Sequence, residues 1–216
     1  MAERSPSGKV LRDAESGFSL IELMVAMAIF TIFVVIVMAS VLAISRSAVR
    51  TQLVGETTSS TLVVFGSLDR QIRYSDSINF SGAGTSGNRY IEFRVPAAST
   101  VGGLQSICYQ WRFSVANSRL ESRQWNESNP AGATAWSPKL TNVANDGDPT
   151  HPFLMTPANG ADKPRQQLTI TLNVGTNAQN AGASMSTTFI ARNTSSLTSP
   201  SNNPSTPVCT FGAYRP

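Results

Sequence analysis

Few side chains in this 216-residue chain have the types and spacing that catalysis or a cofactor requires. His151 is the only histidine, and it lies in the proline-flanked segment Asp148-Pro149-Thr150-His151-Pro152, with no cysteine close by. A catalytic triad needs a base that is held by a partner residue, and nothing in this segment suggests one. We therefore expect His151 to be a surface-loop residue, and we expect neither an enzyme nor a bound cofactor.

The segment Asn145-Asp146-Gly147-Asp148 is a second candidate, because its side-chain oxygens could bind calcium. It lacks the further carboxylates and the spacing of an EF-hand loop. Asn, Asp and Gly are also the ordinary residues of turns. We expect a turn here, with calcium binding as the alternative.

Glu22 is the third candidate, because it is the only charged residue between Phe18 and Ile44. A carboxylate at the centre of a membrane helix costs about 2.5–3.5 kcal/mol, and such residues usually mark function. Glu22 lies only one turn inside the apolar run, so it could reach the membrane interface. The alternative is a boundary carboxylate near a helix N-terminus, which the helix dipole favours by about 0.3–1 kcal/mol.

The segment around Glu22 is long and apolar. Its other polar residues are Ser19, Thr31 and Ser40, which are small enough to bond back onto a helix backbone. As a helix, the 27 residues from Phe18 to Ile44 would reach roughly 40 Å, against a hydrocarbon core of about 30 Å. The segment 18–44 therefore predicts a membrane-spanning helix.

The order Gly17-Phe18-Ser19-Leu20-Ile21-Glu22-Leu23 resembles the prepilin signature of type IV pilins and type II secretion pseudopilins. This resemblance covers about residues 9–46. It implies that a membrane-embedded prepilin peptidase cleaves after Gly17 and methylates the new N-terminal residue, Phe18. Residues 1–17 would then be a polar leader, and Glu22 would serve filament assembly.

Orientation in the membrane rests mainly on that resemblance. The leader holds Arg4, Lys9 and Arg12, against Arg46 and Arg50 just after the apolar run. The positive-inside rule counts these basic residues and gives little weight to acidic ones, so the balance barely favours either direction. The resemblance implies a leader in the cytoplasm and a C-terminal domain outside it.

The helix is predicted to continue through residues 45–74. That segment has no proline, and Val49, Leu53, Val64, Leu68 and Ile72 recur at helical spacing. Many major pilins carry a proline 22 residues after the cleavage site, where this chain has Ala39. A kink of that kind is therefore not expected.

Residues 75–216 are predicted to form a β-rich domain outside the cytoplasm. Alternation of apolar residues predicts strands at 91–95, 107–115, 120–125 and 168–174, with a weaker strand at 185–191. Residues 126–167 and 193–207 are predicted to be loops. The expected fold class is α+β, with the long helix packed on an antiparallel sheet.

Cys108 and Cys209 are the only cysteines, and both lie on the side predicted to be exported. Thiols are commonly oxidised there. The strands at 107–115 and 120–125 are expected to form a hairpin through the turn signal Ala116-Asn117-Ser118, and a bond would fix the C-terminal end to that hairpin. A bridge closing about 100 residues contributes about 4.7 kcal/mol in the chain-entropy model. We expect a disulfide, with two free thiols as the alternative.

Net charge is +4, from 17 basic and 13 acidic residues, and the arginines are mostly isolated in the sequence. The charge therefore gives no reason to predict a nucleic-acid partner. The resemblance implies a structural subunit, a minor pilin or pseudopilin of the larger J- or W-like kind, with other pilin subunits as partners. The alternative is an uncleaved single-span membrane protein with an exposed β-rich binding domain.

Overall fold

The computed structural model describes residues 19–176, 181–210 and 214–216. The chain divides into two compact units, Met1–Ala48 and Val49–Pro216. Helix α1 (Leu20–Arg73) begins in the first unit and ends in the second. It passes Ala39 without interruption, so the predicted continuation of the apolar helix is confirmed.

In the second unit, α1 presents one face to the β-rich domain. Its buried residues recur at spacings of three and four, which places them on one side of a helix. These residues are Thr61, Val64, Phe65, Leu68 and Ile72. Gly66 is on an exposed face, where an added Cβ atom would meet no neighbouring atom.

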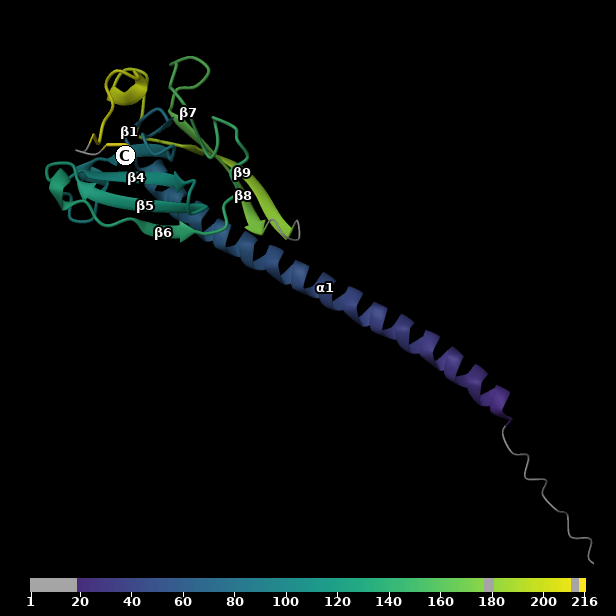
Figure 1. The fold of residues 1–216 in the computed structure, drawn as a ribbon. Coiled ribbons are helices and arrows are strands. Elements are labelled where there is room, and N and C mark those ends of the chain that lie inside the picture. The colour runs from purple at the N-terminus through teal and green to yellow at the C-terminus, as the bar shows by residue number, and fades with distance from the viewer. Residues whose placement is uncertain (1–18, 177–180, 211–213) are drawn as a thin grey trace, which may run out of the picture. The chain divides into compact units, whose positions relative to one another are not determined.

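The larger sheet, here called sheet A, is antiparallel, with the strand order β1-β3-β4-β5-β6 and with β2 paired to β3 (Figure 1). Leu120 to Trp125 return alongside β4 after a turn at Ser118, so the predicted hairpin is confirmed. The strands are β1 (Ser77–Ile78), β2 (Gly82–Ala83), β3 (Arg89–Val95), β4 (Ile107–Ser114), β5 (Arg119–Asn126) and β6 (Ser137–Leu140).

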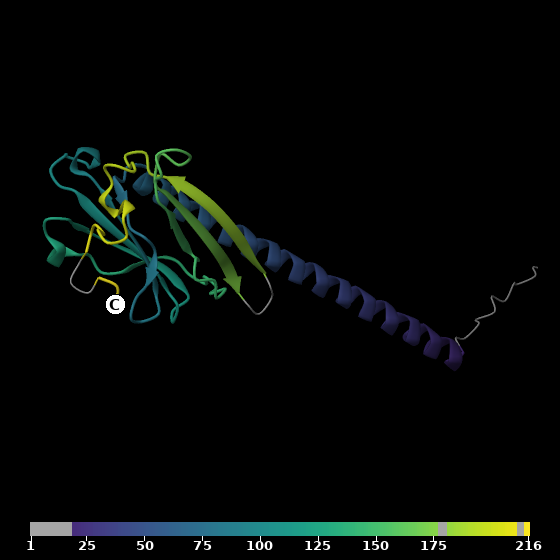
Figure 2. The ribbon, with the colours of Figure 1, turned by 90° about the horizontal axis from the view of Figure 1, so that it is seen from above.

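The smaller sheet, sheet B, has the antiparallel order β7-β8-β9. Its strands are β7 (Phe153–Thr156), β8 (Gln167–Thr176) and β9 (Ala181–Ile190). Figure 2 shows β8 and β9 as one long hairpin beside sheet A. Short 3-10 helices occur at Ala97–Ser99, Pro130–Gly132 and Pro200–Asn202.

Both sheets and the helix share one hydrophobic core. Ile91 and Phe93 of β3 face the core together with Trp111 of β4, because alternate residues of a strand point to one face. From sheet B, Leu168 and Ile170 close the same core. The predicted α+β fold, with a long N-terminal helix on antiparallel strands, is therefore confirmed.

The segment predicted as a loop at 126–167 is corrected by the structure. It contains β6 and β7, which are four residues each and therefore too short to show a clear alternation. The segment 193–207 is irregular, but it is fixed by hydrogen bonds to the start of β1. Ser201 N donates to Ser77 Oγ at 3.1 Å, and Ser199 Oγ donates to the Asp76 carbonyl at 2.7 Å.

Candidate functional site

Glu22 lies in the first turn of α1, three residues after Ser19, which caps the helix. The Glu22 amide donates to the carbonyl of Ser19 at 3.0 Å and to Ser19 Oγ at 3.3 Å. Serine before a helix with glutamate three residues later is the capping-box pattern, in which side chains satisfy the unpaired amides of the first turn. The local sequence therefore explains why the helix begins at Leu20 and why a carboxylate is tolerated there.

Gly17 and Phe18, the predicted cleavage and methylation sites, lie outside the described residues. In the chain they immediately precede Ser19, so cleavage after Gly17 would leave Phe18 next to the capping residue. Cleavage and methylation therefore stay predictions from the sequence.

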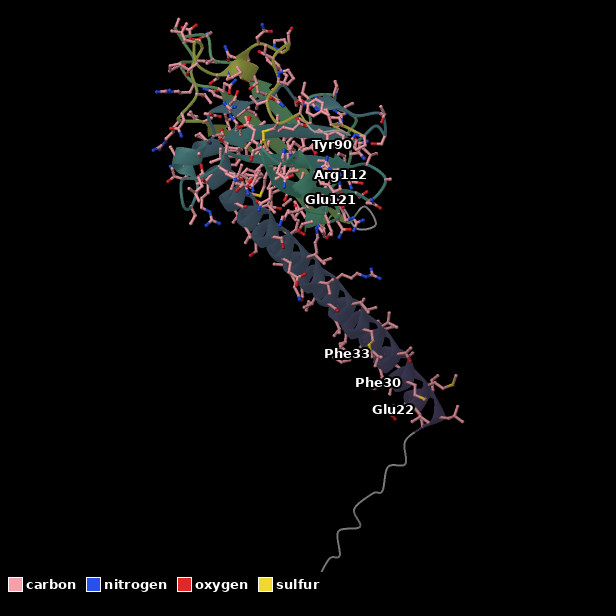
Figure 3. The ribbon with its side chains drawn as sticks, turned by 90° about the vertical axis from the view of Figure 1, so that its left-hand side faces the viewer. Glu22, Phe30, Phe33, Tyr90, Arg112 and Glu121 are labelled. Atoms are coloured by element: carbon pink, nitrogen blue, oxygen red, sulfur yellow. A yellow bond between two sulfur atoms is a disulfide. The ribbon has the colours of Figure 1, made fainter. Side chains whose placement is uncertain are left out.

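The side chains of residues 19–50 are all exposed in the structure. Figure 3 shows Glu22, Phe30 and Phe33 projecting from α1. The Thr31 hydroxyl donates to the Met27 carbonyl at 2.7 Å, so it leaves no free donor to face an apolar environment. Within the described residues, α1 is the one helix long and apolar enough to cross a membrane by length and composition.

Cys108 and Cys209 are joined by a disulfide, with their Cα atoms 5.6 Å apart. The bond fixes the C-terminal segment to β4 on the face of sheet A that points away from the core. Trp125 and Val208 pack around it as a small second apolar cluster. This cluster holds the C-terminal segment next to the outer side of β3.

A buried carboxylate, Glu92 of β3, lies under that segment and was not identified from the sequence. It is fully buried and pairs with Arg215, whose Nη2 lies 2.6 Å from Glu92 Oε2. Gln110 Nε2 donates to Glu92 Oε1 at 2.9 Å, and the Tyr214 hydroxyl donates to Glu92 Oε2 at 3.1 Å. Burial, followed by the charge of Glu92, raises the pKa of Tyr214 to about 12. The only signal in the sequence was a charged residue at an alternate position of a predicted strand.

A second polar cluster lies on the same outer face, where Figure 3 shows Tyr90, Arg112 and Glu121 together. Arg112 Nε lies 2.7 Å from Glu121 Oε2, and its guanidinium lies 4.0 Å from the centre of the Trp136 ring. Glu121 is nearly fully buried, so this pair satisfies a carboxylate that would otherwise be costly. The contacts explain stability and supply no catalytic arrangement.

The acidic segment at 145–148 forms consecutive turns, as predicted. Asn145 Oδ1 accepts from the Gly147 amide at 3.2 Å, and Asp146 Oδ1 accepts from the Asp148 amide at 3.1 Å. Asp146 also contacts the His151 ring. Partial burial is the largest single effect on the pKa of the Asp146 carboxyl and raises it, but the hydrogen bonds from His151 and from the Asp148 amide together outweigh burial, so the pKa is lowered. Among the described residues, no group of His, Cys, Asp or Glu could hold a metal ion.

An open groove of about 490 Å³ lies between the second half of α1 and β6. Glu56 of the helix and Lys139 of the strand are on its walls, together with hydroxyl and apolar side chains. No nucleophile with an activating base is among its lining residues.

Comparison with known proteins gives one match. A family model for the prokaryotic N-terminal methylation motif matches residues 12–38, which include Gly17, Phe18, Glu22 and the first part of the apolar helix. No curated protein and no solved structure matches the chain. The N-terminal motif and the fold are therefore the features of this chain that bear on its function.

Proposed function

We propose that this pilin-like protein, which carries an N-terminal methylation motif, is a minor pilin or pseudopilin of a type IV pilus-like filament. The motif is characteristic of structural proteins, and the protein is not an enzyme. The observation that carries the proposal is the motif at residues 12–38, continuous with a helix that begins at Leu20.

Processing is the first step of the proposed function. A prepilin peptidase cleaves after Gly17 and methylates the amino group of Phe18. The cut lies before the apolar segment, so the whole of α1 stays in the mature protein. This order differs from a secretory signal peptide, whose apolar region is removed.

Assembly is the second step. The uncleaved protein spans the cytoplasmic membrane once, with its β-rich domain outside the cytoplasm, and it joins a cell-surface or periplasmic filament after cleavage. Its apolar helix then moves from lipid into a bundle of similar helices. The hydrophobic free energy of the helix changes little in this step, so close packing between helices determines the stability of the bundle. Small residues at Ala26, Ala28 and Ala39 permit such an approach.

The finer assignment, to the larger J- or W-like subunits, rests on architecture. The support is the chain length, the single long helix and the hairpin of β4 and β5 with its aromatic residues. The motif itself is common to pilins and pseudopilins and does not separate them.

Mass spectrometry of the full-length gene product from its own membranes tests the proposal. We expect an N-terminus at Phe18 that carries one methyl group. Gly17→Val should leave the uncleaved chain, because a branched side chain obstructs a peptidase site built for glycine. Gly8→Val, the same change within the leader, should be processed normally.

An intact leader in the wild-type protein, or normal cleavage of the Gly17→Val variant, would contradict the proposal. Either result would favour the uncleaved single-span protein.

A further inference from the structure

The outer edge of sheet B is formed by β9, and it is open. Ala181–Ile190 pairs with β8 along its whole length, and among the described residues it has no other strand partner. Its sequence, AGASMSTTFI, contains neither a charged residue nor a proline. A strand edge presents unpaired N–H and C=O groups, and such an edge is a template for another chain.

The other strand edges of the described domain are protected. Edge strand β6 carries Pro138 and Lys139, both of which discourage pairing. Edge strand β7 has four residues and is flanked by Pro152 and Pro157. Strands β1 and β2 have two residues each. Among these edge strands, only β9 has ten residues and neither a charged residue nor a proline. An unprotected edge is therefore specific to β9.

The helix extends the open edge with an apolar surface. The Phe65 ring of α1 contacts Phe189 of β9, with their centroids 5.8 Å apart. Gln71 of α1 accepts a hydrogen bond from Trp111 of sheet A, and it lies about 120° from Phe65 around the helix axis. Leu62 lies about 60° from Phe65 in the opposite direction around that axis. Leu62 therefore lies beside Phe65 on the side of α1 opposite Gln71 and sheet A, and it is 54% exposed.

The two faces of the β9 edge differ in chemistry. On the outer face, Ser186 and Thr188 pair with hydroxyls of β8 at 2.9 and 2.8 Å. On the inner face, Met185 and Phe189 pack against the core. A strand added to this edge would continue a hydroxyl face outside and would cover Leu62 with its inward side chains.

We propose that the free edge of β9 accepts an extended strand from a neighbouring pilin-like subunit of a different sequence. The strand is uncharged, with hydroxyl side chains on one face and apolar side chains on the other. This inference rests on the proposed function, because it assigns a docking surface to a subunit of a filament.

A second copy of β9 does not fit this edge. The strand and the helix run in the same direction, because Phe189 contacts Phe65 and the Arg192 amide bonds to the Arg73 carbonyl. Antiparallel pairing of two β9 strands would therefore reverse one helix, although both chains enter the same membrane. Parallel pairing about a two-fold axis would place the hydroxyl face of one copy beside the apolar face of the other.

Charged substitutions on the edge test the inference in cells that assemble filaments. The double variant Ser184→Lys and Ser186→Lys places two charges on β9, as natural protected edges do. The matched control, Thr169→Lys and Thr171→Lys, places the same charges on the same face of the central strand β8. We expect the edge variant to be processed normally but to fall about tenfold in sheared filaments, a loss of about 1.4 kcal/mol in incorporation. The control should stay near the wild-type level.

A photo-crosslinking residue at position 186 identifies the partner in the same filaments. We expect an adduct with a different chain that carries its own methylated N-terminus, and a much weaker adduct from position 171. Wild-type incorporation of the edge variant, adducts of equal yield from both positions, or an adduct between two copies of this chain would overturn the inference. If instead the wild-type protein is absent from filaments, the proposed function fails.

Discussion

The position of a carboxylate at Glu22, near the start of an apolar helix, can be explained physically in two ways. The Glu22 amide donates to Ser19 Oγ in the first turn of the helix, where the helix dipole favours a carboxylate, and this accounts for its position without any role in assembly. Cleavage after Gly17 would add a second reason, because it creates an amino group on Phe18 that is largely cationic near neutral pH. An unpaired charge among apolar helices costs several kcal/mol, and a carboxylate one turn away can neutralise it.

Two substitutions of Glu22 separate these explanations. Glutamine at this position removes the charge but keeps a side chain of the capping-box type, whereas alanine removes both. The bond from the residue-22 amide to Ser19 Oγ can form in either variant. If Glu22 pairs with the Phe18 amine, both variants insert and are cleaved, and both fall about tenfold or more in sheared filaments relative to membranes. Normal incorporation of Glu22→Gln with poor incorporation of Glu22→Ala would indicate a capping role. Wild-type levels of both variants would refute an assembly role.

Tyr214 gives a prediction for pH. Its pKa is raised to about 12 by burial and by Glu92, from an ordinary value near 10. The folded state therefore holds this proton more tightly than the unfolded state does. The resulting stability is fully present below about pH 10 and is lost as pH rises toward about 12.

Urea unfolding of the detergent-solubilised protein measures this effect. We expect the stability difference between wild type and Tyr214→Phe to shrink between about pH 9 and about pH 11.5. Tyr109, whose pKa burial also raises, titrates in both proteins and cancels from the difference. Identical pH dependence of the two proteins would rule out this role of Tyr214.

At the scale of elements, the sequence predicts those segments whose side chains repeat regularly. The helix, β3, β4, β5 and β8 alternate or repeat clearly, and the structure contains all of them. Strand β9 begins with Ala-Gly-Ala-Ser, which carries little apolar signal, so only its second half was predicted. Its N-terminal half is held in place by the register with β8, a tertiary contact that a local pattern does not encode.

The residues of the candidate site also divide into those that a local pattern identifies and those that only the folded chain brings together. Gly17, Phe18 and Glu22 are contiguous, so a local motif suffices to identify them. Glu92 and Arg215 are 123 residues apart and are brought together only when the C-terminal segment crosses β3. A buried ion pair of that kind depends on topology, and no local pattern could have predicted it.

Two glycines test opposite consequences of local packing. Gly66 lies in an exposed part of α1 with no atom near an added Cβ, so Gly66→Ala should stabilise the domain by about 0.5–1 kcal/mol. At Gly84, an added Cβ would lie 2.6 Å from the Arg215 carbonyl oxygen and 2.7 Å from the Tyr90 ring. Gly84→Ala should therefore destabilise the domain. Urea unfolding of the solubilised protein should give shifts of opposite sign, and equal shifts would contradict this view of the packing.

At the scale of the whole molecule, two features bear on the orientation of the chain in the membrane: the charges that flank the apolar run, and the disulfide. Three basic residues precede the apolar run and two follow it, so the charge bias is small. The disulfide between Cys108 and Cys209 requires an oxidising compartment, which the cytoplasm is not. The redox state of these two cysteines therefore reports on which side of the membrane the β-rich domain lies.

Changing the leader charges should invert part of the population. Replacing Arg4, Lys9 and Arg12 with glutamine leaves Arg46 and Arg50 as the basic residues that flank the apolar run. Because basic flanks favour the cytoplasmic side, roughly half or more of the chains should then insert with the β-rich domain in the cytoplasm. Those chains should have two free thiols, which alkylation detects as a mass shift, whereas wild type should have none. Replacing Arg46 and Arg50 instead should leave both cysteines fully oxidised, because the bias then favours the proposed direction, with the leader in the cytoplasm. Complete oxidation in the leader variant would show that these charges do not set the orientation.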